Sequence, residues 1–164
     1  MKRVFKRILI ILLIIFVLIQ FIRPEKNKSD GISPNDISTL YPVPDSIRSI
    51  LKVACNDCHS NNTRYPWYAE IQPVTWWLNN HIVDGKKDLN FSEFAKYRIR
   101  KQYVKFEQII ELVKENAMPL ASYTWIHKDA ILSDRQKEAI MNWSESIRDS
   151  IKANYPPDSL VRRK

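Results

Sequence analysis

Cys55-Asn56-Asp57-Cys58-His59 is the most informative stretch of this chain of 164 residues. Two thiols one helical turn apart, followed at once by an imidazole, are typical of the attachment site of a c-type haem. Each thiol can form a thioether with one vinyl group of the porphyrin, and His59 then binds the iron. Cys55 and Cys58 are the only cysteines. We therefore expect one covalently attached haem c and no disulfide.

A zinc site or a redox-active dithiol accounts less well for the same cysteines. A structural zinc site needs four ligands, usually in two separated pairs, whereas His59 adjoins Cys58 and no second Cys-x-x-Cys is present. A thioredoxin-like dithiol belongs in a βαβ unit, whereas the flanking sequence has helical periodicity. A chance match remains the plain alternative. The motif and its context together favour haem attachment.

The N-terminal 23 residues have the features of a signal anchor. The run from Ile8 to Ile22 is apolar except for Gln20, and it is followed by Arg23. A helix over these residues spans about 22 Å, short of the ~30 Å hydrocarbon core, but two more apolar residues and snorkelling basic side chains make a span feasible. Because no cleavage site follows, we expect an uncleaved transmembrane helix through residues 4–22. Four basic residues precede this helix: Lys2, Arg3, Lys6 and Arg7. They predict a single-pass inner-membrane protein with its N-terminus in the cytoplasm and its C-terminal domain in the periplasm.

The net charge of +8 does not indicate a nucleic-acid partner. Eight of the 26 basic residues flank the anchor or form the last three positions, so residues 24–161 carry equal numbers of basic and acidic side chains. A neutral domain lacks the basic surface that nucleic-acid binding requires. The excess charge therefore reflects the anchor and a solvated tail.

The rest of the chain divides into a polar, turn-rich tether over residues 24–43, a domain over residues 44–155 and a basic tail over residues 156–164. Two glycines in the whole chain and no alternating runs argue against a sheet. We expect an all-α fold: a small, cytochrome c-like helical domain behind one transmembrane helix.

Periodicity and capping signals place the expected helices. A first helix opens near Pro44 and leads directly into Cys55. A second covers residues 74–83, with Gly85 as its C-terminal cap. Asn90 with Glu93, and Ser133 with Gln136, have the spacing of capping boxes. Apolar residues at helical spacing predict the buried faces of the last two helices. The first of these faces contains Phe106, Ile109, Ile110 and Val113, and the second contains Ile140, Trp143, Ile147 and Ile151.

Few residues can supply a second axial ligand to the iron. Met118 follows a helix in a segment that Pro119 terminates, and a loop methionine of this kind can point its sulfur at a metal. His81 is the alternative, although it lies on an apolar helix face where a histidine bonded to a carbonyl is the usual finding. Met141 sits in a capped amphipathic helix, which suggests ordinary packing, and His127 lies in a loop. We favour Met118 with His59 and keep His81 open.

Several motifs resemble a known family. The order of parts is similar to that of class I c-type cytochromes, and more closely to the bacterial haem-binding domain family of Bacteroidetes-type proteins. The resemblance covers about residues 40–150 and implies a single c-type haem in an anchored, exported domain. It rests on these stretches: residues 58–68, residues 73–78, His81-Ile82, residues 89–93 and Met118-Pro119-Leu120.

Side chains near the motif suggest how the haem would be held. A porphyrin needs a dry apolar wall, and four aromatic residues suit it, although a plain helical core would also bury them. Arg64 can bind a haem propionate because a guanidinium matches carboxylate geometry, or it can be a free surface arginine. The aromatic residues are Tyr65, Trp67, Trp76 and Trp77.

These features predict a one-electron carrier with His/Met-ligated iron, which exchanges electrons with an unidentified redox partner protein. We do not expect an enzyme. The alternatives are a haem-based sensor or binding module with a labile sixth ligand, and a haem peroxidase. A peroxidase needs an open iron position, which Met118 would fill, and the chain has no evident output domain for a sensor.

Overall fold

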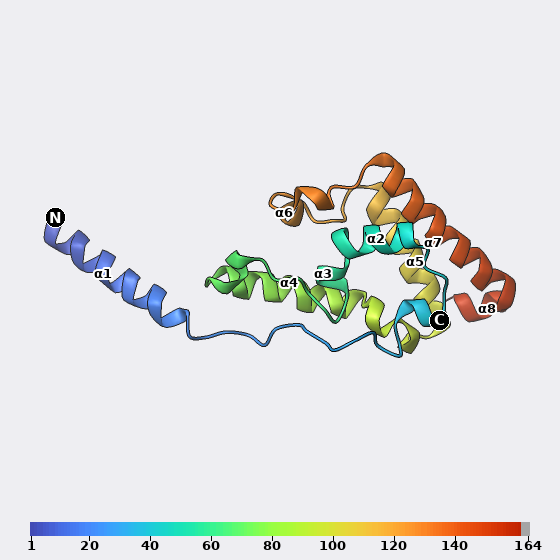
Figure 1. The fold of residues 1–164 in the computed structure, drawn as a ribbon, viewed down its shortest axis with the longest axis horizontal. Helices are drawn as coiled ribbons and strands as arrows, with labels where there is room; N and C mark the ends of the chain where they lie inside the picture. Colours follow the sequence, from blue (N-terminus) through green and yellow to red (C-terminus); the bar gives the residue numbers. More distant parts are fainter. Residues whose placement is uncertain (162–164) are drawn as a thin grey trace.

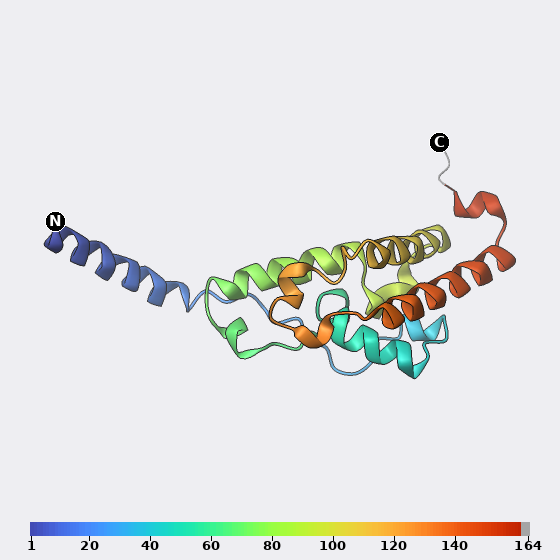
Figure 2. The ribbon, with the colours of Figure 1, turned by 90° about the horizontal axis from the view of Figure 1, so that it is seen from above.

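The computed structural model describes residues 1–161, and within them every regular element is helical, as the sequence predicts. Figures 1 and 2 show an elongated molecule in which α1 projects from one end of a helical body. The α-helices are α1 Lys2–Ile19, α2 Asp45–Ala54, α3 Asn56–His59, α4 Val74–Asp88, α5 Ile99–Lys114, α6 Ala121–Thr124, α7 Asp134–Asn154 and α8 Pro157–Leu160. The 3₁₀ helices are η1 Ile37–Thr39, η2 Trp67–Glu70, η3 Phe91–Lys96 and η4 Lys128–Ala130.

The structure corrects the expectation of a transmembrane helix. α1 has 18 residues and ends at Ile19, and its first third contains the four basic side chains. The remaining apolar part, residues 8–19, rises only about 18 Å, against the ~30 Å of a hydrocarbon core. In residues 1–161, none of the helices combines the length and the apolar character that crossing a membrane requires. The predicted transmembrane anchor over residues 4–22 and the single-pass inner-membrane location are therefore wrong.

The segment expected to be a tether lies along the domain. The Asn27 side chain donates to the Ser60 carbonyl at 2.8 Å and to Thr63 Oγ1 at 2.9 Å. Ile37 in η1 is buried in the main core. A turn closes over residues 33–36, where the Asp36 N–H donates to the Ser33 carbonyl, and three apolar residues pack the segment onto the body: Ile37, Tyr41 and Val43. Of the expected basic tail, part forms α8, and residues 162–164 lie outside the described residues.

The body is held together by an antiparallel pair, α5 and α7, which lie side by side in Figures 1 and 2. Phe106 of α5 contacts Trp143 of α7 edge to face, with ring centroids 5.6 Å apart. Trp143 also donates to the Pro42 carbonyl at 3.0 Å. The core continues from this pair onto α2 and η3, and its buried members are Ile37, Ile47, Leu51, Phe91, Phe94, Phe106, Trp143, Ile147 and Ile151.

Local sequence signals located two helices correctly. α2 buries the face that its apolar spacing predicts: Ile47, Ile50, Leu51 and Ala54. α7 begins with the predicted capping box, in which Ser133 Oγ accepts from the Gln136 N–H and the Gln136 side chain accepts from the Ser133 N–H. Both signals depend on neighbours within a few residues, which is why the sequence alone reveals them.

One predicted helix end is wrong, and one predicted capping box is incomplete. α4 does not end before Gly85 but continues to Asp88, so Gly85 lies inside the helix. Asn90 does cap η3 by accepting from the Ser92 N–H, but its own N–H donates to the Tyr97 hydroxyl instead of to Glu93. Glu93 instead accepts from Asn61 Nδ2 at 2.9 Å. In both places a contact with a distant segment replaces the expected local one.

Candidate functional site

The cysteine motif forms a tight helical turn at the end of α2. The carbonyl of Cys55 accepts from the N–H groups of Cys58 and His59, at 3.2 and 3.0 Å. Cys55 itself separates α2 from α3, with φ −127° and ψ −43°. This turn holds the two cysteines and the histidine in the fixed relation that the motif predicts.

The imidazole of His59 is oriented by two backbone carbonyls. Its Nδ1 lies 3.0 Å from the Gly85 oxygen and 3.0 Å from the Leu89 oxygen. A carbonyl can only accept, so Nδ1 carries the proton and Nε2 keeps its lone pair. A histidine that binds a metal is usually fixed in this way, with the second nitrogen donating to a carbonyl or carboxylate. His59 therefore presents Nε2 as a ready ligand.

Gly85 allows α4 to approach the motif closely. A Cβ at this position would lie 2.7 Å from the Cys58 carbonyl oxygen and 3.1 Å from Cys58 Cβ. The backbone of Gly85 is ordinary helix, so the glycine is needed for space and not for an unusual φ. The sequence interpretation of Gly85 as a helix cap missed this role. The Gly85 carbonyl contacts His59 Nδ1, and the absence of a side chain at Gly85 leaves room for the backbone of Cys58.

Two adjoining cavities open beside the motif. The first has a volume of about 400 Å³ and lies between α3, α4 and the segment after α5. The second, of about 210 Å³, lies between α5 and the residues that follow α4. Four residues line both cavities: Cys55, His59, Asp88 and Met118. The combined space is therefore bordered by a cysteine, by the oriented imidazole and by a methionine from a distant segment.

Met118 reaches this space because α5 ends in a Schellman motif. The N–H of Ala117 donates to the Leu112 carbonyl at 2.9 Å, and the N–H of Asn116 donates to the Val113 carbonyl at 3.2 Å. Asn116 is left-handed, with φ 57°, a conformation that asparagine tolerates better than most residues. The chain reverses here, and Met118 follows directly at the cavity wall.

The two thiols are unsuited to thiolate chemistry. Burial, with a smaller contribution from Cys58, raises the pKa of Cys55 to about 12. Burial, with a smaller contribution from Asp57, raises the pKa of Cys58 to about 11. Reactive or metal-binding cysteines have a lowered pKa instead. No three residues of the metal-binding types histidine, cysteine, aspartate and glutamate gather into a metal-binding cluster in residues 1–161. Both findings disfavour the dithiol and zinc alternatives.

The remaining predicted site residues separate into two groups. Trp77 and His81 line the first cavity, and His81 Nδ1 bonds to the Trp77 carbonyl at 2.8 Å. Tyr65 lines neither cavity, and its hydroxyl accepts from the Asn27 N–H at 2.7 Å. Trp67 also lies outside them and is 78% exposed, so the expectation that it forms a buried wall is wrong. The indole of Trp76 donates to the Ile22 carbonyl instead of facing the cavities.

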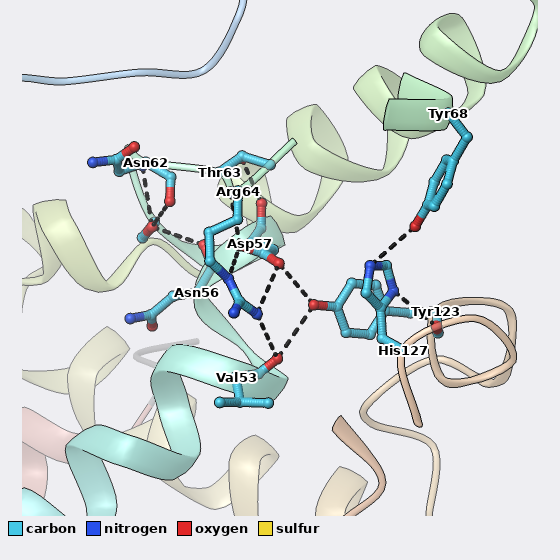
Figure 3. Close-up of polar contacts among 10 residues, drawn as sticks. Val53, Asn56, Asp57, Asn62, Thr63, Arg64, Tyr68, Tyr123 and His127 are labelled. Carbon is cyan, nitrogen blue, oxygen red and sulfur yellow. Dashed lines mark hydrogen bonds and ion pairs between the residues drawn. The ribbon is translucent and has the colours of Figure 1, made fainter. Parts of the chain in front are cut away.

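Arg64 pairs with a residue that the sequence did not single out. Figure 3 shows Asp57, inside the motif, at the centre of a polar network. Its carboxylate accepts from the Arg64 backbone N–H at 2.9 Å and from the Tyr123 hydroxyl at 2.7 Å, and it forms an ion pair with the Arg64 guanidinium at 3.4 Å. Burial and this bond to Asp57 raise the pKa of Tyr123. The network fastens the α6 segment, just after Met118, to the motif.

The network extends away from the motif through stacked rings. The ring of Tyr123 stacks on His127 with centroids 4.1 Å apart, and His127 Nε2 bonds to the Tyr68 hydroxyl at 3.0 Å. His127 is thereby occupied in holding η2 to the α6 segment. This contact removes it from the candidates for an axial ligand.

Comparison with known proteins gives one match. A family model described as a haem-binding domain matches residues 14–146, which is more than half of the chain. No curated protein matches the chain. No solved structure matches it either.

Proposed function

We propose, starting from the fact that the chain belongs to the haem-binding domain family, that it binds one haem c covalently and carries single electrons. Haem binding itself follows from the family. The covalent attachment through Cys55 and Cys58, the His59 and Met118 ligation and the electron-carrier role are the proposal. When bound, haem supplies an iron that gains and loses one electron.

One observation carries the proposal: Cys55, His59 and Met118 border the same pair of cavities. A thiol, an imidazole whose free nitrogen is Nε2, and a thioether are the groups that attach and ligate a c-type haem. They come from α2, α3 and the segment after α5, which are brought together only by folding. The first cavity, of about 400 Å³, falls in the size range of cofactor sites, and the adjoining cavity of about 210 Å³ extends this space. The residues present therefore fit the group.

The surrounding residues suit an electron carrier more than an enzyme. Two protein ligands leave no iron position for a substrate. Trp77 and Leu120 contribute apolar surface to the first cavity, and an apolar surrounding raises the potential of a haem site. A redox partner protein would then exchange electrons with the site.

A sensor or binding module is the second candidate, and it is favoured by one observation. His81 lines the first cavity together with Met118, so a second ligating side chain is near the proposed sixth ligand. A site with two competing ligands can open to a small gas molecule. The carrier proposal requires that Met118 stays bound.

The test is made on the full chain, produced with a bacterial c-type haem attachment system. Haem should remain with the polypeptide after denaturation in acid and organic solvent, because two thioethers hold it. The matched control is the Cys55→Ala/Cys58→Ala variant, from which haem should be extracted. Release of haem from the unmodified chain would refute covalent attachment. Carbon monoxide binding by the reduced, unmodified protein would favour the sensor over the carrier.

A further inference from the structure

The walls of the two cavities differ in charge. The first cavity is lined by three carboxylates, Asp57, Asp84 and Asp88, and by no lysine or arginine among residues 1–161. The second is lined by Lys105 as well as Asp88. Haem carries two negatively charged propionates, which carboxylates repel and an ammonium attracts. The second cavity is therefore the better side for a propionate.

Lys105 lacks a charged partner within the described chain. Its amine donates to Gln108 Oε1 at 2.8 Å, but in residues 1–161 it forms no ion pair. The residue is half-buried. Burial lowers the pKa of its amine, the charge of Asp88 acts in the opposite direction, and the charge of Lys101, one turn earlier on α5, lowers the pKa further. A partly desolvated cation without a paired anion is unfavourable. A carboxylate from a ligand would relieve this cost.

α5 places Lys105 at a suitable distance from the proposed ligands. Lys105, Gln108, Ile109 and Leu112 line the second cavity at i, i+3, i+4 and i+7 spacing. The Leu112 carbonyl accepts from the Met118 N–H, so this end of the row lies beside the axial ligand. Lys105 is seven residues earlier, about 10 Å along the helix. Propionates lie at the porphyrin edge opposite the vinyl groups, so their partner is expected away from the iron.

We infer that Lys105 binds a propionate of the haem, an inference that rests on the proposed occupancy of the two cavities by haem. An ammonium serves here as a point charge that needs no fixed fork geometry. Arg64, the partner suggested by the sequence, lines neither cavity and is engaged by Asp57. The charged residues that face the propionate are then Lys105 from α5 and Asp88 from α4.

The experiment measures how the reduction potential of the haem-loaded full chain depends on pH. The pKa of a propionate is read as the pH at which the reduction potential begins to change. Lys105→Gln should raise this pH by about one unit, since an opposite charge nearby lowers the pKa of a carboxyl group by 1–3 units. Asp88→Asn should shift it to lower pH by removing a like charge. Lys105→Arg keeps the charge, and Lys114→Gln removes an exposed lysine of the same helix, so both should leave it unchanged.

Each outcome decides the inference. An unchanged ionisation in Lys105→Gln overturns it. Loss of haem from Lys105→Gln with retention in Lys105→Arg supports it, whereas loss from both overturns it, because packing and not charge would then matter. The proposed function is judged separately by the denaturation test, since the titration works on haem held covalently or not. A chain that binds no haem at all overturns both.

Discussion

Replacing Gly85 by alanine tests whether close packing of α4 on the cysteine motif builds the site. The new methyl group would lie 2.7 Å from the Cys58 oxygen, whereas ordinary contact begins at about 3.4 Å. The two segments must therefore separate by about 0.7 Å. The same movement would lengthen the His59 Nδ1 contact with the Gly85 oxygen from 3.0 Å to about 3.7 Å, beyond hydrogen-bonding distance. The Leu89 carbonyl would remain as the second acceptor.

Three contributions set the expected change in the free energy of unfolding. Overpacking costs about 1–3 kcal/mol, and the lost hydrogen bond costs up to about 1 kcal/mol. Alanine is favoured over glycine inside a helix by about 1 kcal/mol. The net result is a destabilisation of up to about 3 kcal/mol. For a chain of this size each kcal/mol lowers Tm by about 2–4 °C.

Urea unfolding of the full chain without haem, followed by circular dichroism, measures this change. Lys87→Ala, an exposed substitution in the same helix, is the control and should stay within about 0.5 kcal/mol of the unmodified chain. Gly85→Val should be worse than Gly85→Ala, because it adds more atoms at the same contact. A Gly85→Ala chain that is more stable than the unmodified one, as helix propensity alone predicts, would refute the reasoning.

Three further predictions follow from the site. Met118→Ala should open the sixth iron position, lower the reduction potential and allow carbon monoxide to bind. His81→Ala should leave the absorption spectrum unchanged. The reverse pattern would make His81 the ligand. In the chain without haem, iodoacetamide should alkylate Cys58 about 100-fold more slowly at pH 8 than an ordinary thiol. The reason is that its pKa is raised from 9.0 to about 11, and the thiolate fraction falls tenfold for each pKa unit. Equal alkylation rates in the folded and urea-unfolded chains would contradict this. Tyr123→Phe should destabilise the chain by about 1–2 kcal/mol in urea unfolding, because it removes the bond to the buried Asp57 carboxylate, whereas Tyr155→Phe, in a half-exposed residue, should have little effect.

The aromatic residues show where sequence reasoning stops. Trp67 and Trp77 both lie near the motif in sequence, and both suit a haem wall by residue type. The structure places Trp77 at the first cavity, where it is still 46% exposed, and leaves Trp67 outside both cavities and 78% exposed. Residue type gives the preference of a side chain for apolar surroundings, but the direction in which a short 3₁₀ turn presents it depends on the packing of that turn. Sequence pattern therefore could not separate the two residues.

The N-terminal segment shows a different failure. Hydropathy alone suggests that residues 4–22 form one long apolar helix. In the structure the helix ends at Ile19 and includes four basic side chains, and Gln20 then bonds to the backbone of Gln72. Gln72 is fully buried and donates in turn to the Ile22 carbonyl. A contact 50 residues distant in sequence thus accompanies the end of the helix.

Features that depend on neighbours a few residues apart could be predicted from the sequence. These are the helical class, the spacing of Cys55, Cys58 and His59, the buried face of α2 and the capping box of α7, because hydrogen bonds and side-chain periodicity within one or two turns are encoded locally. The groups that surround the motif could be identified only from the folded chain. The acceptors for His59 come from Gly85 and Leu89, the Tyr123 partner of Asp57 comes from the α6 segment, and the lysine that lines the second cavity comes from α5. Backbone carbonyls carry no residue signature, and charge pairing depends on distances that only the packed chain sets.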